Sequence, residues 1–300
     1  YCEMGNKPMT LLKQVCTPCI DDHQLAPEDF LNKGVLAPVC AKIVLKVLFT
    51  ARIGRPDLLW SVNTLARNVT KWSVADDKRL HRLISYLHWT SQWKQTCFVG
   101  DAPDKCWLAV FCDASFAGDL KDSKSTTGAY ICLVGPNTFV PVTWMCKKHG
   151  AVSHSSTEAE VIAMEGASRM EGIPCLDLWE QVLELFYPTP DEDKEHLSEE
   201  TSFSSSSRLY RDVYGLLGDV DDLPCNVPSP VLTEEGIGRA QMVIFEDNEA
   251  VIKITMKGRS PAMRHIGRTH RINLDWILER IANDPGVSIR YVGTKQQIAD

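Results

Sequence analysis

The sequence lacks any apolar run that approaches the ~18 residues of a membrane-spanning helix. Hydrophobic residues still make up 44% of its 300 residues, which is enough for a sizeable core. It also lacks a basic-then-apolar leader after Tyr1, and it stops at Asp300 shortly after an expected helix start. We therefore expect one large or two ordinary domains, no signal peptide, and a chain taken from a longer protein.

Cysteines are present but form no regular framework. The chain has 11 of them, and several, such as Cys40, Cys112 and Cys132, lie in apolar segments where a free thiol behaves as a small hydrophobe. Cys16 and Cys19 form a Cys-x-x-Cys pair with no second pair nearby, which argues against a zinc site. This usage is typical of a reducing compartment.

Positive charge is scarce overall, but the deficit lies in one segment. The net charge is -7, and residues 187–240 contain twelve acidic and four basic residues, so the remainder carries +1. Residues 187–240 are also rich in Ser and Pro and poor in apolar residues, and we expect an acidic, disordered insertion there. Residues 1–100 hold thirteen basic and eight acidic residues. This surplus permits contact with nucleic acid without establishing it.

The first third of the chain predicts an extended lead-in and three helices. Residues 1–36 show little periodicity, whereas Pro38–Arg52, Pro56–Val69 and Val74–Trp89 carry apolar residues at helical spacing. The simplest interpretation is a small helical packing unit. The alternative is a basic platform for a nucleic-acid backbone.

The middle of the chain predicts three sequential strands and a helix. A strand begins at Trp107 and ends near Asp113, and Gly128–Val134 and Phe139–Cys146 follow after short turns, which indicates an antiparallel meander. Ser155, Ser156 or Thr157 can cap a helix that continues to about Phe186. Glu160 shares a face with Ala163, Met164 and Ala167, so we expect it to face the sheet and Glu158 to be more exposed.

The last third repeats the strand-then-acid pattern. The segment Gln241–Asn248 is a short strand ending at Asp247, and helices are expected at Ala250–Met256 and Thr269–Ala282. Val287–Val292 reads as a further strand, and Thr294 opens a last helix that carries Asp300. The order predicts a mixed α/β sheet with helices on its faces.

Four acids stand where these elements end or begin: Asp113, Glu160, Asp247 and Asp300. Each alone has a simpler explanation, since an isolated Asp can cap a turn and a Glu in a first helical turn can complement the helix dipole. Together at one edge of a sheet they would repel unless cations intervened. Two divalent ions would neutralise them, and oxygen-only ligands select Mg²⁺ or Mn²⁺. Such a site suits hydrolysis of a phosphodiester.

Five motifs, in order, resemble the ribonuclease H domain of copia-type (Pseudoviridae) retrotransposon Pol polyproteins. They are Asp113-Ala-Ser-Phe-Ala-Gly-Asp119, Lys124-Ser-Thr-Thr-Gly128, Ser155-Ser-Thr-Glu-Ala-Glu160, Glu246-Asp-Asn248 and Gln297-Ile-Ala-Asp300. Upstream, Val15-Cys-Thr-Pro18 and Gly54-Arg-Pro-Asp-Leu-Leu-Trp-Ser-Val62 resemble the segment that joins reverse transcriptase to ribonuclease H in those proteins. The resemblance covers nearly the whole chain except the acidic insertion.

The resemblance implies a five-stranded mixed sheet with flanking helices, and hydrolysis of the RNA strand of RNA–DNA hybrids during reverse transcription. It implies that Asp113, Glu160, Asp247 and Asp300 hold two Mg²⁺ ions, with Mn²⁺ as a substitute. The corresponding domains are a lead-in at 1–36, a helical connection at 37–100, a ribonuclease H-like domain at 101–186 and 241–300, and an insertion at 187–240. The upstream reverse transcriptase of the same polyprotein is the implied protein partner. The implied location is intracellular, in cytoplasmic virus-like particles and in the nucleus, with no membrane partner.

Contacts to the hybrid are expected at the phosphate backbone and the 2′-hydroxyls. The candidates are basic and hydroxyl side chains near the acids: Lys121, Lys124, Ser125, Thr126, Arg264, Arg268 and His270. A solvated surface role is an equal alternative for each.

Three departures from the family bear on the function. The paired aspartates of the polymerase are absent, the loop Gly293–Gln297 has no His, and the 187–240 connection is longer than usual. A catalytically inactive remnant that binds nucleic acid or acts as a scaffold is therefore the main alternative. Another nuclease on the same fold, such as an integrase or a resolvase, is a weaker one.

Overall fold

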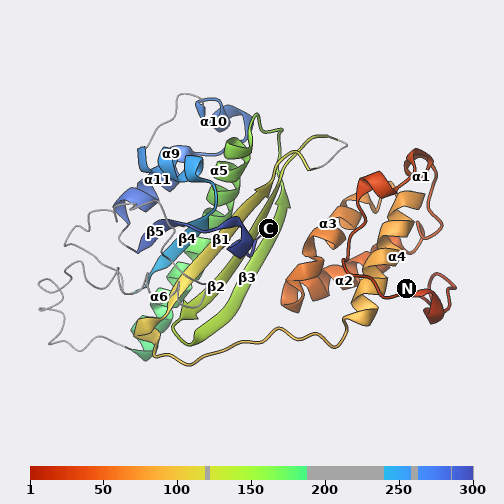
Figure 1. Ribbon diagram of the computed structural model, residues 1–300, viewed down its shortest axis with the longest axis horizontal. Helices are drawn as coiled ribbons and strands as arrows, with labels where there is room; N and C mark the ends of the chain where they lie inside the picture. The colour runs from red at the N-terminus through yellow and green to blue at the C-terminus, as the bar shows by residue number, and fades with distance from the viewer. Residues whose placement is uncertain (119–121, 188–239, 258–262, 285, 300) are drawn as a thin grey trace, which may run out of the picture. The chain divides into compact units, whose positions relative to one another are not determined.

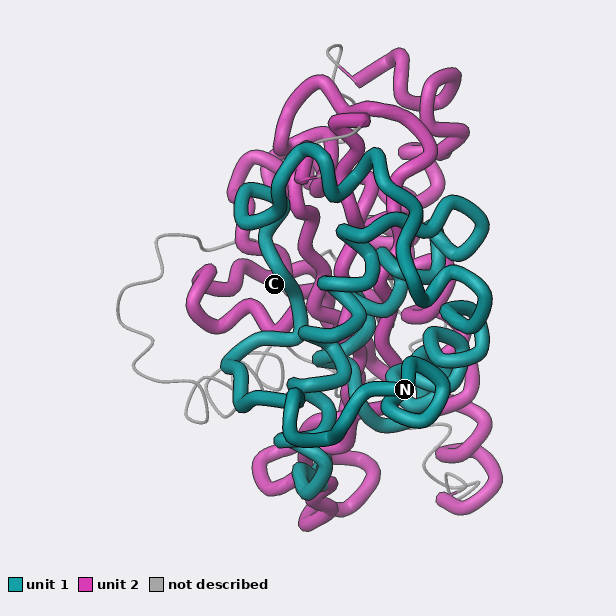
Figure 2. Tube along the Cα trace, turned by 90° about the vertical axis from the view of Figure 1, so that its right-hand side faces the viewer, with its two compact units in different colours: residues 1–96 teal, residues 97–300 magenta. Residues whose placement is uncertain are grey.

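The computed structural model describes residues 1–118, 122–187, 240–257, 263–284 and 286–299 (Figure 1). The chain forms two compact units, Tyr1–Thr96 and Cys97–Asp300, which are coloured separately in Figure 2. Almost all of the expected acidic insertion, and Asp300 itself, lie outside the described residues. Every helix in the described ranges is too short or too polar to cross a bilayer.

Unit 1 is helical. Its three main helices are α2 (Cys40–Gly54), α3 (Leu59–Asn68) and α4 (Val74–Trp89), with the 3-10 turn η3 (Pro56–Leu58) leading into α3. The structure thus confirms the three predicted helices. The stretch before them was expected to be extended, but it contains the short turns η1 (Met9–Leu11) and η2 (Asp22–Gln24) and the single-turn helix α1 (Pro27–Leu31).

Helix α4 illustrates how the local sequence fixes a boundary. The Ser73 hydroxyl accepts a hydrogen bond from the Asp76 amide, and the Asp76 carboxylate accepts one from the Ser73 amide. This reciprocal cap satisfies two backbone donors that the first turn would otherwise leave unpaired. Leu80 and Leu83 then bury the inner face of the helix.

Unit 2 is built on one five-stranded mixed sheet. Its strands are β1 (Trp107–Ser115), β2 (Thr126–Gly135), β3 (Thr138–Lys148), β4 (Met242–Glu246) and β5 (Val287–Tyr291), in the spatial order β3-β2-β1-β4-β5. Strands β1, β2 and β3 form the predicted antiparallel meander, and β4 and β5 add to it in parallel. Because β1 and β4 are parallel neighbours, their carboxyl ends meet at the same edge.

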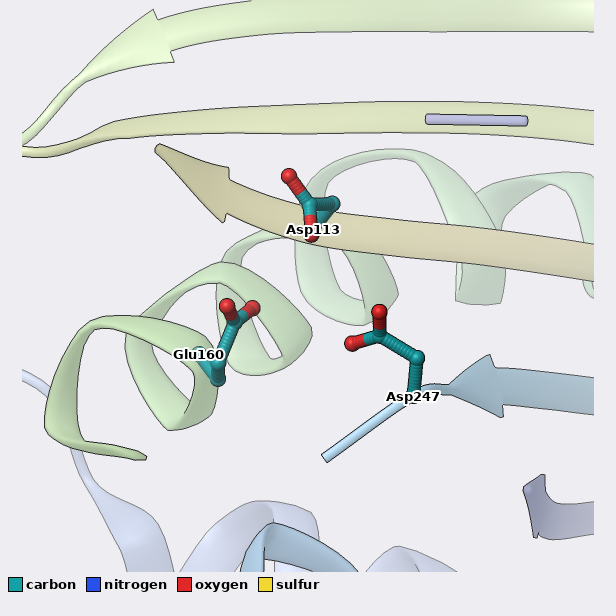
Figure 3. A group of neighbouring side chains, drawn as sticks. All are labelled: Asp113, Glu160 and Asp247. Atoms are coloured by element: carbon teal, nitrogen blue, oxygen red, sulfur yellow. The ribbon is translucent and has the colours of Figure 1, made fainter. Parts of the chain in front are cut away.

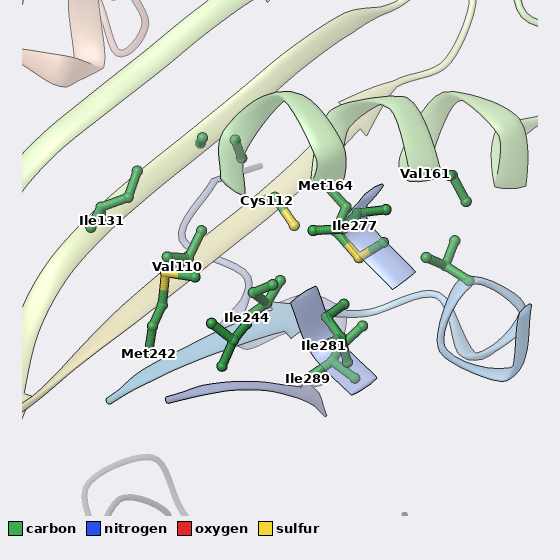
Figure 4. Packing of buried hydrophobic residues seen from close by; sticks show 14 of the residues in the cluster. Val110, Cys112, Ile131, Val161, Met164, Met242, Ile244, Ile277, Ile281 and Ile289 are labelled. Atoms are coloured by element: carbon green, nitrogen blue, oxygen red, sulfur yellow. The ribbon is translucent and has the colours of Figure 1, made fainter. Parts of the chain in front are cut away.

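Helices cover one face of this sheet (Figure 1). They are α5 (Ser156–Ala167), a π-helical turn at Ser168–Gly172, α6 (Ile173–Phe186), α9 (Glu249–Lys257) and α11 (Leu274–Asn283). Alternate strand residues, such as Val110 and Ile244, pack against Met164 of α5 and Ile277 of α11 in one large core (Figure 4). This core fixes the position of α5 over the sheet.

Two expected elements near the carboxyl end differ in the structure. The helix predicted at Thr269–Ala282 is interrupted: α10 (Ile266–Thr269) ends first, Arg271 has a φ of 57°, and α11 begins only after Asn273 caps it. The left-handed backbone of Arg271 is incompatible with a continuous helix. The helix expected from Thr294 is only a 3-10 turn, η7 (Thr294–Gln296), and Gln297 is in extended backbone.

Candidate metal centre

Three of the four acids singled out in the sequence converge in the structure. Asp113, Glu160 and Asp247 each offer a carboxylate oxygen, and these oxygens all lie within 4.8 Å of one another. Figure 3 shows the three side chains pointing toward a common space from β1, α5 and the end of β4. We refer to these three residues as the carboxylate cluster.

The fold explains this convergence. Asp113 lies near the end of the central strand β1, and Asp247 directly follows β4, which is the parallel neighbour of β1. Glu160 is in the first turns of α5, whose small residues Ala159 and Ala163 pack against Ala114. These alanines let the helix approach the strand closely, so a helical carboxylate can reach the strand ends.

The electrostatics of the cluster favour a bound cation. Burial first, and then the nearby acids Glu246, Asp113 and Asp247, raises the pKa of Glu160 to about 9. One carboxylate oxygen of Glu160 is buried without a hydrogen-bond partner. A divalent cation would supply the missing partner and stabilise the ionised form. The oxygen-only donor set fits Mg²⁺ or Mn²⁺.

Glu246 is a fourth buried acid at this edge, and the sequence reasoning did not assign it a role. Its side chain is fully buried. This burial raises the pKa of Glu246 to about 8, and the neighbouring acids Asp247 and Asp113 contribute smaller increases to that value. It accepts a hydrogen bond from the Asn248 amide at 3.2 Å, and the Cys112 thiol donates to it at 3.7 Å. The signal available in the sequence was a Glu at the last position of an otherwise apolar strand.

Asp300, the fourth expected ligand, lies outside the described residues, but the segment before it is placed. The Gln297 side-chain amide donates to the Cys112 carbonyl at 2.9 Å, which lies next to Asp113 in β1. Gly128 is the strand partner of Asp113, and any Cβ at residue 128 would collide with the carbonyl oxygen of Ala299. The residues that precede Asp300 therefore pack beside Asp113.

The expected exposure of Glu158 is wrong. Its side chain is only 3% exposed, because His265 and His270 cover it. The Glu158 carboxylate lies 3.2 Å from His265 Nε2 and 3.1 Å from His270 Nε2, and it accepts a hydrogen bond from the His154 amide at 3.1 Å. Periodicity within α5 could not reveal a cover that comes from more than a hundred residues later in the chain.

The candidate nucleic-acid contacts differ in their exposure. Arg264 and Arg268 are exposed, and Lys124 and Thr126 are half-buried. Two others are corrected by their burial: Ser125 is fully buried and accepts a hydrogen bond from the Ala117 amide, and the His270 ring is 2% exposed against Glu158. Neither side chain faces solvent, so neither is available to a phosphate. Lys121 lies outside the described residues.

His149 and His154 both make contacts within the fold. His149 is buried, with Nε2 2.8 Å from the Thr127 hydroxyl, and burial followed by the neighbouring His270 lowers its pKa to about 4. The His154 ring packs edge-on against His265 at a centroid distance of 5.0 Å.

Comparisons with known proteins relate the chain to retroelements. No protein-family model matches it. It is 35% identical over 121 residues to a Saccharomyces cerevisiae protein named for the transposon Ty5-1, a match that covers 40% of this chain and 37% of that protein. It is 32% identical to the Retrovirus-related Pol polyproteins from transposons RE2 and RE1 of Arabidopsis thaliana, over 45% and 38% of this chain.

The matched part is a small share of these polyproteins, 9% of the RE2 protein and 7% of the RE1 protein. The chain thus spans less than half the length of each of these three relatives. The three relatives are named for transposons, and each match has modest identity and covers part of this chain.

Proposed function

We propose that unit 2 is a ribonuclease H domain that hydrolyses the RNA strand of RNA–DNA hybrids as part of a retrotransposon Pol polyprotein. The mixed five-stranded sheet with helices on one face is consistent with a ribonuclease H-like fold. The relatives named as Pol polyproteins supply the biological context. Both observations agree with the resemblance of the sequence motifs.

The observation that carries the proposal is the convergence of Asp113, Glu160 and Asp247. Bound divalent ions would supply positive charge to an attacking water and to the leaving oxygen of the phosphodiester. The three carboxylates would hold the ions, with Asp300 as the fourth ligand. Because the carboxylates are the ligands, hydrolysis needs no Cys or Ser nucleophile.

Other residues of this chain would orient the site and the substrate. Gln297 fixes the backbone of β1 beside Asp113 and so supports the ligand position. Exposed Arg264 and Arg268, with Lys124, would contact the phosphates of the hybrid. Recognition through the backbone and the 2′-hydroxyl groups makes cleavage tolerant of sequence.

Within this proposal the helical unit 1 is the connection to an upstream reverse transcriptase, which is the expected partner in the same polyprotein. The division into a lead-in, a connection, a ribonuclease H domain and an insertion stays a prediction, as does the intracellular location.

The decisive experiment uses purified protein and a labelled RNA–DNA hybrid. We expect cleavage of the RNA strand in Mg²⁺ or Mn²⁺ and none in a chelator. Asp113→Asn and Asp247→Asn should each reduce the rate by at least about 100-fold, since each removes a charge from the proposed ion site. Their circular dichroism spectra should match the wild type.

Glu249→Gln is the matched control, because Glu249 is an exposed acid two residues beyond Asp247 that pairs with Lys253. It should cut at the wild-type rate. A wild-type protein that binds the hybrid but cuts nothing across Mg²⁺ and Mn²⁺ would contradict the enzymatic proposal. That result would favour the inactive nucleic-acid-binding module.

A further inference from the structure

The buried Glu158 has a role that the metal centre does not explain. It is two residues before Glu160, yet it does not belong to the carboxylate cluster. Its two oxygens lie 3.2 Å from His265 Nε2 and 3.1 Å from His270 Nε2. We refer to these three residues as the histidine bridge.

The histidine bridge joins α5 to a short basic segment, residues 263–271. This segment contains the four-residue helix α10, and its apolar anchors are Met263 and Ile266, both buried. Its other side is exposed and carries Arg264, Arg268 and Arg271. A single helical turn has little stability of its own, so its position depends on these anchors and on the bridge.

The bridge is embedded in further contacts. The His154 amide donates to Glu158, and the His154 ring packs against His265. On the other side His270 packs edge-on against His149 at a centroid distance of 6.4 Å, and His149 is held by Thr127 of β2. These contacts therefore hold the basic segment against the first turn of α5, β2 and the loop after β3.

This arrangement couples two parts of the proposed site. In Figure 1, α10 lies at the end of unit 2 where β1 finishes and α5 begins. The first turns of α5 carry Glu160, which belongs to the carboxylate cluster, and Glu158, which faces the basic segment. One helix end therefore sets the position of a metal ligand and of exposed arginines together.

We propose that Glu158 is a positioning residue that, through His265 and His270, holds the basic segment where its arginines contact the phosphate backbone of the bound hybrid. The inference rests on the proposed function for its substrate. The bridge acts on binding rather than on chemistry, because Glu158 itself touches neither the cluster nor the substrate.

The test compares Glu158→Gln with Glu165→Gln. Glu165 is another buried acid on α5 outside the carboxylate cluster, 5% exposed in its side chain, and it pairs with Arg169 instead of the basic segment. Both variants keep the shape of the side chain and replace a buried carboxyl group by an amide. Hybrid Kd is measured in Ca²⁺ at several salt concentrations, alongside the unfolding temperature.

We expect Glu158→Gln to raise the hybrid Kd about 5-fold or more and to lower the salt slope of log Kd by about one to two, since one or two phosphate contacts are lost. Arg268→Ala should weaken binding in the wild type but add little in the Glu158→Gln background. Glu165→Gln should leave Kd and salt slope unchanged. In Mg²⁺, Glu158→Gln should raise KM and leave kcat within about twofold.

Two results would overturn the inference. Equal Kd values for Glu158→Gln and the wild type, with only a lower unfolding temperature, would make Glu158 structural. A lower kcat with unchanged KM and Kd would mean that it acts on Glu160 instead. Failure of the proposed function is distinguishable, because a protein that never cuts still reports the coupling of Glu158 and Arg268 through the Kd values.

Discussion

At the scale of single residues, the site depends on one glycine as much as on its acids. Gly128 pairs with Asp113 across β1 and β2, and the backbone of Ala299 occupies the space that a side chain at residue 128 would need. The absence of a side chain therefore lets the segment that contains Ala299 approach Asp113. The sequence motif contained this glycine, but nothing in its pattern named the segment that it admits.

Gly128→Ala should displace residues 297–299 from the strand. We expect the free energy of unfolding to fall by about 1–3 kcal/mol, because the inserted methyl group meets backbone that cannot rotate away. We also expect hybrid cleavage to fall by at least about 10-fold, because the fourth ligand would move with the segment. Chemical denaturation and initial rates measure the two effects.

Gly150→Ala is the matched control, since a Cβ at residue 150 meets nothing within 4 Å. It should be neutral in both measurements. Full activity in Gly128→Ala would show that the Ala299 segment is not needed at the site.

At the scale of elements, α5 has the most demanding position, since its first turns hold both Glu158 and Glu160. Ser155 caps it by accepting a hydrogen bond from the Glu158 amide at 3.1 Å. The cap was among the three residues expected from the sequence. The cap therefore fixes the turn from which Glu160 projects.

Ser155→Ala should lower the free energy of unfolding by about 1 kcal/mol, the usual effect of losing a helix cap. It should also weaken Mg²⁺ activation, because the turn before Glu160 becomes free to fray. Titration of the cleavage rate with Mg²⁺ measures this shift. Ser156→Ala, one residue further on, is the comparison, and equal Mg²⁺ dependence in the two variants would contradict the assigned role.

Prediction succeeded for elements whose boundaries are set locally and failed where distant segments decide. Val74–Trp89 was predicted with its observed bounds, because Ser73 and Asp76 cap it from within. The break at Arg271 and the cover over Glu158 were missed, because hydrophobic periodicity reports neither a left-handed residue nor a contact from a distant segment. The convergence of Asp113, Glu160 and Asp247 could be inferred, because two parallel neighbouring strands end at the same edge of the sheet. The capped start of the helix can lie at that same edge.

At the scale of the whole molecule, the carboxylate cluster on which the proposed activity depends lowers the stability of the metal-free protein. The raised pKa of Glu160, about 9, means that the folded protein holds a proton that the unfolded chain releases near the ordinary value of 4.5. Without metal, the free energy of unfolding should therefore fall as the pH rises from about 4.5 toward about 9. Divalent ions should reverse this trend, because they bind the ionised form.

Glu160→Gln should abolish cleavage and yet stabilise the metal-free protein. At pH 7 the gain in free energy of unfolding is at most about 3 kcal/mol, the amount linked to the pKa shift of this carboxyl. Denaturation curves in a chelator from pH 5 to pH 8 measure the gain, which should grow with pH. His149, whose lowered pKa makes acid destabilising instead, is common to both proteins and cancels in the difference.

A decrease in the free energy of unfolding for Glu160→Gln across that pH range would mean that the Glu160 carboxylate does not destabilise the metal-free fold. The same curves in Mg²⁺ should show the wild type regaining the difference.

The strand order has a consequence for the folding of the protein during its translation. The meander β1-β2-β3 and helix α5 contain Asp113 and Glu160, and they can assemble from neighbouring stretches of the emerging chain. Strand β4 is the parallel neighbour of β1 in space but lies far from it in sequence. Asp247, which follows β4, therefore reaches β1 only after the long stretch between α6 and β4 has been translated. Distant pairings of this kind form late. Under the proposed function, a nascent chain therefore cannot cut nucleic acid before β4 and Asp247 have been made.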